Sequence, residues 1–201
     1  MKKTALWSIA AFALLAACQP TGGQQADIKE LREDVDALKV EVFGDPLASC
    51  EDDKIFSGIA PYADTLLDLP DPDLEPEAWH TSNGLRQGVT TTDSGLQYTI
   101  VQQGKDGGPS PVGSQIIKVN YHGIFPDGKT FDSSYDRGQP IDFPANGVIQ
   151  GWVEAMGGMK PCEARTLYIP GDLAYGPNGR GGIPPNATLL FHVQLLAVDP
   201  K

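Results

Sequence analysis

The chain has 201 residues, of which 40% are hydrophobic and 20% charged, values that suit one globular domain with a smaller additional segment. Its formal net charge of −11 argues against nucleic acid as a partner, because phosphate binding needs a basic surface. The acidity is concentrated in residues 19–93, with 17 acidic and 5 basic residues, whereas residues 94–201 contain 9 and 8. The acidic segment is interpreted as a solvated leader, and an acidic docking surface is the alternative.

The first eighteen residues follow the order of a bacterial secretion signal. A basic start, Met1-Lys2-Lys3, precedes an apolar run over residues 5–17 that is too short to span a bilayer. The run ends in Leu15-Ala16-Ala17-Cys18, where small residues before a cysteine resemble the lipobox of bacterial lipoproteins. The resemblance implies a signal peptide at residues 1–17 and lipidation of Cys18. A buried N-terminal helix is the alternative, and it fits this order less well.

The lipobox resemblance also predicts where the protein resides. Several acyl chains together form a stable membrane anchor. Residue 19 is Gln and not Asp, which favours the outer membrane, facing the periplasm, by resemblance to bacterial sorting patterns. The polar residues 18–26 are then a lipidated tether between the anchor and the rest of the chain.

Residues 27–93 are expected to form an acidic helical and linker segment. Apolar residues recur at spacings of three and four from Ile28 to Val42, which predicts one helix with a narrow apolar stripe. This helix either docks on its own chain or pairs with a second copy in a dimer. Residues 61–76 are rich in Pro and Asp and predict an extended connector, and residues 76–87 predict a short helix with Pro76 in its first turn.

From Gly95 onwards the apolar residues alternate with period two, which predicts half-buried strands. The alternation is clearest around Leu96, Tyr121 and Phe191, and Pro126-Asp127-Gly128 predicts a turn between two strands. Only residues 149–156 in this half are typical of a helix. The fold class is therefore α+β, with an antiparallel sheet and one short helix.

Several kinds of chemistry lack support in the sequence. There is no His-Glu-x-x-His, no Gly-x-Ser-x-Gly and no phosphate loop, and His80, His122 and His192 are far apart. Without a Cys-x-x-Cys pair, redox chemistry and a zinc site also lack support, so no metal and no cofactor is predicted. The envelope is oxidising, but the sequence leaves open whether Cys50 and Cys162 form a disulfide.

Six aromatic residues in the C-terminal half indicate either a core or a pocket. They are Tyr121, Phe131, Phe143, Trp152, Tyr175 and Phe191. Two details favour a pocket: Phe131 is followed at once by Asp132, and Tyr175 lies in a loop rich in Gly and Pro. An apolar hollow with a few polar groups is the usual form of a site for a small ligand.

The motifs around these aromatic residues resemble one protein family. They are Val119-Asn120-Tyr121-His122-Gly123, residues 127–134 (DGKTFDSS), Val148-Ile149-Gln150-Gly151-Trp152, Ala174-Tyr175-Gly176 and residues 182–191 (GIPPNATLLF). In order and spacing, residues 94–201 resemble the FKBP-type peptidyl-prolyl cis-trans isomerases, in particular bacterial envelope members of the macrophage-infectivity-potentiator group. The resemblance implies a bent antiparallel sheet wrapped around one short helix, preceded by a short helical and extended N-terminal segment.

The resemblance also implies a site between the sheet and the helix that takes a proline ring. By position, Tyr121, Phe131, Asp132, Phe143, Val148, Ile149, Trp152, Tyr175, Ile183 and Phe191 line it. Asp132, Tyr175, Trp152 and Phe131 carry the catalysis, Trp152 forms the floor, and Arg137 is a partner for Asp132. Ile141 replaces an aromatic residue of many relatives, and the loop over residues 177–182 is one residue short.

The implied activity is isomerisation of Xaa-Pro bonds in envelope or secreted polypeptides, through stabilisation of a twisted amide in an apolar aromatic pocket. No cofactor is needed, and macrolide inhibitors of the family are implied as pocket ligands. Two alternatives stand beside it. The domain could hold proline-containing segments as a weakly catalytic chaperone, or it could serve as a spacer in a structural lipoprotein that assembles through its leader helix.

Overall fold

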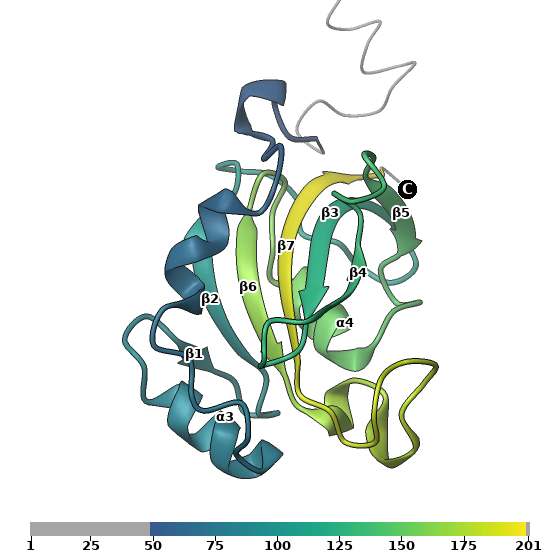
Figure 1. Ribbon diagram of the computed structural model, residues 1–201. Helices are drawn as coiled ribbons and strands as arrows, with labels where there is room; N and C mark the ends of the chain where they lie inside the picture. Colours follow the sequence, from purple (N-terminus) through teal and green to yellow (C-terminus); the bar gives the residue numbers. More distant parts are fainter. Residues whose placement is uncertain (1–48, 200–201) are drawn as a thin grey trace, which may run out of the picture. The chain divides into compact units, whose positions relative to one another are not determined.

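A computed structural model describes residues 49–199, which form one seven-stranded sheet with helical segments packed on it (Figure 1). All strand pairs are antiparallel, in the order β1-β2-β6-β7-β3-β4, with β5 also paired to β3. The strands are β1 (Thr90–Thr91), β2 (Gln97–Gln102), β3 (Ile116–Ile124), β4 (Thr130–Ser133), β5 (Ile141–Pro144), β6 (Ala164–Ile169) and β7 (Leu189–Val198). The predicted α+β class with an antiparallel sheet is confirmed.

One helix packs against one face of this sheet and forms the main hydrophobic core with it. Helix α4 (Gln150–Gly157) confirms the helix predicted at residues 149–156, and it buries Trp152 and Met156 against apolar residues of β3, β6 and β7. The helix approaches β6 closely because Gly151 has no side chain. A Cβ at this position would lie 2.6 Å from a methyl carbon of Ile169, so only glycine fits here.

The turn between β3 and β4 forms where the sequence predicts it. The amide of Gly128 donates to the Phe125 carbonyl at 2.9 Å, and Gly128 has φ +83°, a conformation that glycine adopts without strain. This turn places the start of β4, and with it Phe131 and Asp132, alongside the end of β3.

Residues 49–87 cover the opposite face of the sheet, and we call them the strap. The prediction of an extended connector at residues 61–76 is wrong in its first part, because Ala60–Leu66 form a 3-10 helix with Pro61 in the first turn. The ring of Tyr62 stacks on His192 of β7 at a centroid distance of 4.7 Å, and the hydroxyls of Thr65 and Thr166 are 2.7 Å apart. These contacts pack the strap against the sheet.

Helix α3 (Pro76–Gly84) follows as predicted, although it ends three residues earlier than expected. Its fully buried Trp79 belongs to a second apolar cluster with Tyr168, Leu190 and Ile124. Farther along the strap, the Arg86 guanidinium donates to the carbonyls of Thr65 (2.9 Å) and Leu67 (2.5 Å). One side chain therefore ties two stretches of the strap together.

The strap explains why the prediction of half-buried strands is wrong for the central strands. The polar residues of β3 and β7 that alternate with the core residues are themselves buried, including Asn120, His122 and His192. In β2, which lies between β1 and β6, the pattern is even reversed: the Gln97 residue is 4% exposed and the Ile100 residue 40%. The Gln97 side chain can be buried because its polar atoms are paired. Its oxygen accepts from the side-chain amide of Asn83 on α3, and its nitrogen donates to the His80 carbonyl.

A disulfide joins the beginning of the strap to the sheet. Cys50 bonds to Cys162, 112 residues later, and the Cys50 amide donates to the Leu196 carbonyl of β7 at 2.5 Å. Residues 49–93 thus belong to the same compact unit as the strands, with no break at residue 94. The signal peptide, Cys18, the tether and the predicted helix over residues 28–42 lie outside the described residues. No helix within residues 49–199 is long and apolar enough to cross a membrane.

Candidate active site

A cavity of about 870 Å³ opens between helix α4, the sheet and the loop from β6 to β7. All eleven residues expected to form the site line it: Tyr121, Phe131, Asp132, Arg137, Phe143, Val148, Ile149, Trp152, Tyr175, Ile183 and Phe191. The sequence indicated either a core or a pocket for the six aromatic residues. Both interpretations are correct in part, since the rings belong to the main core and also line a hollow.

Trp152 lines the cavity from helix α4 and packs against the aromatic rings around it. It projects from the first turn of α4, and only 4% of its surface is exposed. The rings of Phe191 and Tyr121 meet it edge to face, with centroids 5.2 and 5.4 Å away and interplanar angles of 82° and 85°. Such pairs contribute about 0.5–1.5 kcal/mol beyond area burial. The arrangement fixes a rigid apolar wall.

Ile149, at the start of α4, lines the cavity and has a backbone amide with no partner among the described residues. Ile149 is the N-cap residue, with extended backbone, and its carbonyl accepts from the amides of Trp152 and Val153. The amide of Ile149 itself donates no hydrogen bond to any residue between 49 and 199. The first amides of a helix commonly lack partners within it and are available to a ligand.

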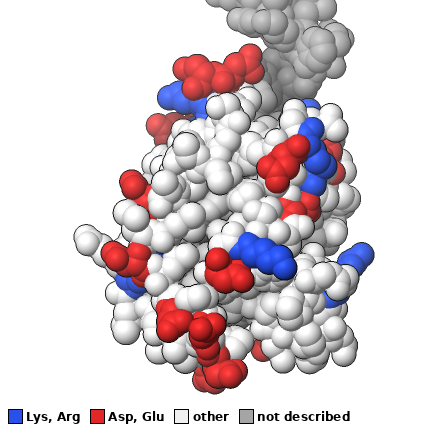
Figure 2. Space-filling model, viewed as in Figure 1, with Lys and Arg blue, Asp and Glu red and all other residues white. Residues whose placement is uncertain are grey.

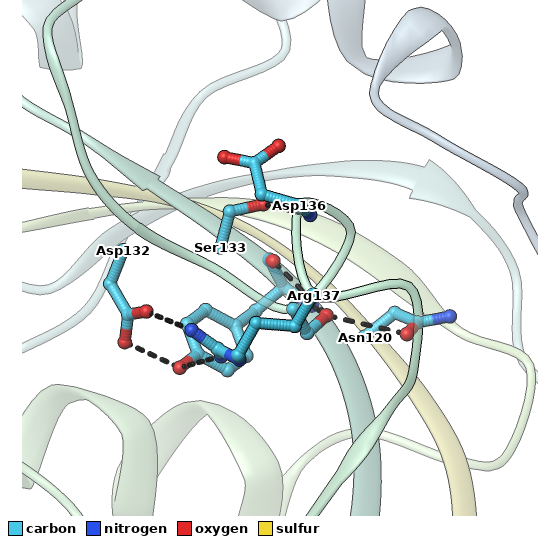
Figure 3. A network of polar contacts seen from close by, with 7 residues as sticks. Asn120, Asp132, Ser133, Asp136 and Arg137 are labelled. Atoms are coloured by element: carbon cyan, nitrogen blue, oxygen red, sulfur yellow. Dashed lines mark hydrogen bonds and ion pairs between the residues drawn. The ribbon is translucent and has the colours of Figure 1, made fainter.

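Three residues that line the cavity, Tyr121, Asp132 and Arg137, form a polar network (Figure 3). The Tyr121 hydroxyl donates to one carboxylate oxygen of Asp132 at 2.5 Å, and Arg137 pairs with the other oxygen. Arg137 also donates to the Tyr121 hydroxyl at 2.7 Å, and its guanidinium lies 5.4 Å from the centre of the Tyr121 ring. The network joins β3, β4 and the turn after β4.

Ser134 anchors the turn that carries Arg137. Its hydroxyl accepts a hydrogen bond from the Tyr121 amide at 2.8 Å and donates toward the Asn120 side chain at 3.3 Å. The amide of Arg137 donates to the Ser134 carbonyl at 3.2 Å. Because Ser134 is fully buried, these bonds hold the turn, and with it the guanidinium, beside Asp132 (Figure 3).

The network fixes the charge of each member at neutral pH. Partial burial acts to raise the pKa of Asp132, but hydrogen bonds from Tyr121 and Arg137 outweigh it and hold the pKa below its usual value. Burial, together with the hydrogen bond to Asp132, raises the pKa of Tyr121 to about 12. Asp132 is therefore ionised and Tyr121 protonated across the physiological range.

The loop from β6 to β7 completes the cavity with Tyr175, Ile183 and Arg180. Within this loop the Asn186 amide donates to the Gly176 carbonyl at 2.9 Å, which joins the two sides of the loop. The Tyr175 hydroxyl has no hydrogen-bond partner within the described part of the chain. Sequence reasoning missed Arg180, because a single cation in a glycine-rich loop matches no motif. Ile141 of β5 also lines the cavity.

The three histidines lie away from this cavity. The rings of His122 and His192 are stacked at 6.1 Å on the face that the strap covers, and His80 lies on α3. Between residues 49 and 199 no group of three or more His, Cys, Asp or Glu residues is placed to hold a metal ion.

Comparison with known proteins gives the same picture for the C-terminal half. Residues 108–196 match the family model described as FKBP-type peptidyl-prolyl cis-trans isomerase. The chain is 44% identical over 123 residues to the isomerase FkpA of Aeromonas hydrophila, covering 61% of this chain and 45% of that protein. It is 46% identical over 125 residues to the isomerase Mip of Coxiella burnetii, covering 62% and 54%. The chain thus spans about half the length of these curated relatives.

Solved structures extend the similarity beyond that half. The crystal structure of FkpA from Escherichia coli matches with a TM-score of 0.60 and 32% identity, covering 96% of this chain and 80% of that one. A peptidyl-prolyl cis-trans isomerase from Pseudomonas syringae matches with a TM-score of 0.58 and 34% identity, covering 62% and 91%. With its aromatic cavity, its polar network and these relatives, the chain belongs to the FKBP-type peptidyl-prolyl cis-trans isomerase family.

Proposed function

We propose that this protein catalyses the cis–trans isomerisation of Xaa-Pro bonds in polypeptides. One observation carries the proposal: a single cavity combines a floor and walls of packed aromatic rings with an ionised carboxylate held by Tyr121 and Arg137. The cavity offers an apolar surface to a proline ring and a fixed carboxylate beside it.

The reaction needs no nucleophile and no metal. Rotation about a peptide bond is slow because resonance must be broken, at a cost of about 18–20 kcal/mol. Before proline the cis and trans forms differ by only about 0.5–1 kcal/mol, so both are populated but exchange slowly. A catalyst therefore has to favour the twisted amide over both planar forms.

The cavity is suited to this task because a twisted amide carries less charge separation than a planar one. Water solvates the polar planar form best, whereas a hollow built around Trp152, Tyr121 and Phe191 favours the less polar twisted form. A proline ring resting on Trp152 would place the bond to be turned among these rings. Each 1.36 kcal/mol by which the barrier falls increases the rate tenfold.

Two donors in the cavity can hold the flanking carbonyls. Ile149 and Tyr175 both line the cavity, and the amide of Ile149 and the hydroxyl of Tyr175 lack partners within residues 49–199. We propose that these two groups donate hydrogen bonds to carbonyl groups of the substrate backbone. They would then hold one side of the Xaa-Pro bond while the other side rotates. Asp132, held rigid by Arg137, would set the field around the carbonyl that rotates.

An isomerisation assay with a neutral substitution tests this assignment. Asp132→Asn keeps the shape of the side chain but removes its charge, and we expect kcat/KM for a proline peptide to fall about tenfold. Asp142→Asn is the matched control, because Asp142 is exposed on β5 and does not line the cavity, so its rate should stay at that of the wild type. A wild-type protein that binds proline peptides without accelerating them would instead be a binding module.

We further propose that the protein is a lipoprotein of the bacterial envelope that assists the folding of envelope or secreted proteins. The lipobox at residues 15–18 supports it, and so does the Cys50–Cys162 disulfide, since disulfides persist in oxidising compartments. Labelled palmitate should be incorporated into the wild type and not into Cys18→Ser. Labelling of both proteins, or of neither, would reject the assignment.

We also propose that macrolide inhibitors of the family occupy the same cavity, because their apolar rings would cover Trp152 as a proline ring does. A macrolide should then compete with the proline peptide and raise the apparent KM without changing kcat. Inhibition that additional peptide does not relieve would place the macrolide elsewhere.

A further inference from the structure

We infer that Arg180 gives this cavity a preference for acidic substrates, namely polypeptides with Asp or Glu next to the proline whose bond is turned. The inference rests on the proposed isomerase function and adds a substrate class to it. Arg180 is the one charged residue lining the cavity that does not belong to the polar network.

Arg180 is a cation that lines the cavity and has no ion-pair partner within residues 49–199. Its side chain is exposed and lines the cavity, and it forms no ion pair or hydrogen bond with any side chain between residues 49 and 199. Figure 2 shows that most of the blue groups on the face in view adjoin red ones. What distinguishes Arg180 from the other exposed cations of residues 49–199 that form no ion pair, such as Lys118, is its place in the lining of the cavity.

The other charges of the cavity cancel one another. Its lining contains three charged residues, Asp132, Arg137 and Arg180, and the first two form an ion pair. The charge that remains for a bound chain is therefore the single positive charge of Arg180. A carboxylate on the substrate is the group that an unpaired guanidinium binds best, because its two oxygens match the planar donors.

The backbone at Arg180 is held in place beside the cavity. The amide of Arg180 donates to the Ile183 carbonyl at 3.1 Å, and the amide of Ile183 donates back at 2.9 Å. Gly181 closes this hairpin with φ +57°, and a Cβ at Gly179 would collide with the Ile183 carbonyl oxygen. Since Ile183 itself lines the cavity, the hairpin keeps the start of the Arg180 side chain at its edge.

The effect should be modest, because the guanidinium is exposed and water screens it. Exposed ion pairs are weak, so we expect roughly a threefold preference, which corresponds to about 0.65 kcal/mol at 1.36 kcal/mol per tenfold. A preference of this size changes the order in which substrates are processed without excluding neutral ones.

The test uses peptides that differ only in the residue beside proline: Glu, Gln or Lys, placed before the proline in one set and after it in another. Isomerisation is followed by NMR exchange, because a coupling protease would add its own charge preference. For the wild type we expect kcat/KM to rank Glu above Gln above Lys in at least one set. In Arg180→Gln the ratio of Glu to Lys should approach one, and in Arg180→Glu it should invert.

Two controls separate this inference from the proposed function. Lys118→Gln removes an exposed cation of β3 outside the cavity and should keep the wild-type ratio. Added salt should reduce the wild-type preference, because the Debye length is about 8 Å at 0.15 M and about 3 Å at 1 M. Equal rates for Glu and Lys peptides in the wild type, or a preference that survives in Arg180→Gln, would overturn the inference. Absence of acceleration with the Gln peptides would overturn the isomerase function itself.

Discussion

The two faces of the sheet are built from alternating residues of the same strands, yet they serve different ends. Tyr121 and Phe191 point to the cavity, whereas their neighbours His122 and His192 point to the strap. On the cavity side, rings pack around a hollow that stays open to a ligand. On the strap side, residues 49–87 fill the space and a disulfide closes it. Buried polar and aromatic groups thus mark the site on one face and support the fold on the other.

Substituting the two buried tryptophans should give the largest effects and should distinguish the two faces of the sheet. Trp152 on α4 and Trp79 on α3 are both nearly inaccessible, one on each face. Truncating either to Ala should cost about 3–5 kcal/mol of unfolding free energy, which urea denaturation measures. Only Trp152→Ala should also lower kcat/KM, by at least about tenfold.

If the Ala variants are too unstable to purify, the corresponding Phe variants allow the same comparison with smaller costs. Equal losses of activity at the two positions would mean that the assay reports stability and not the cavity.

The disulfide should matter for stability and not for catalysis. Cys50 and Cys162 are 112 residues apart, so breaking the bond frees a long loop in the unfolded chain and should cost about 2–4 kcal/mol. The urea midpoint should fall on reduction, while kcat/KM at 25 °C stays constant. The double variant Cys50→Ser/Cys162→Ser should match the reduced wild type and should not respond to reductant. A loss of activity on reduction would show that the strap shapes the cavity.

The stacked His122 and His192, which the strap covers, should make the free energy of unfolding depend on pH. This effect should be smaller than those above. Burial, with a contribution from His122, lowers the pKa of His192 to about 4, from about 6.5 in the unfolded chain. The neutral ring is favoured in the fold, so stability is present above pH 6.5 and is lost as the pH falls toward 4. The loss at pH 5 relative to pH 8 should be about 2 kcal/mol. His192→Asn should flatten this dependence; an unchanged slope would place the titrating group elsewhere.

The cavity should show the smallest pH effect of all. Because the pKa of Asp132 lies below its usual value and that of Tyr121 at about 12, neither group titrates between pH 5 and 9. Where the protein stays folded, kcat/KM should be flat over this interval. A bell-shaped profile centred near neutrality would require a titrating group that the cavity does not contain.

The cavity was open to prediction from the sequence because its residues lie in motifs of recognisable order, and all eleven meet in one hollow. The packing of the strap on the sheet could not be predicted from the sequence. Tyr62 and Thr65 lie in a segment rich in Pro and Asp, which is typical of connectors. Asn120 and His192 alternate with apolar residues and so indicated a solvated face. Arg180 belongs to no motif, and cysteine spacing alone says nothing about which residues pair.

The most direct test of the central claim is NMR exchange spectroscopy of a proline peptide with substoichiometric amounts of the purified protein. The account predicts that the cis–trans exchange rate rises in proportion to protein concentration while the fraction of cis peptide stays constant, as it must for a catalyst. A shift in the cis fraction at stoichiometric protein with an unchanged exchange rate would contradict it and would make the cavity a binding site alone.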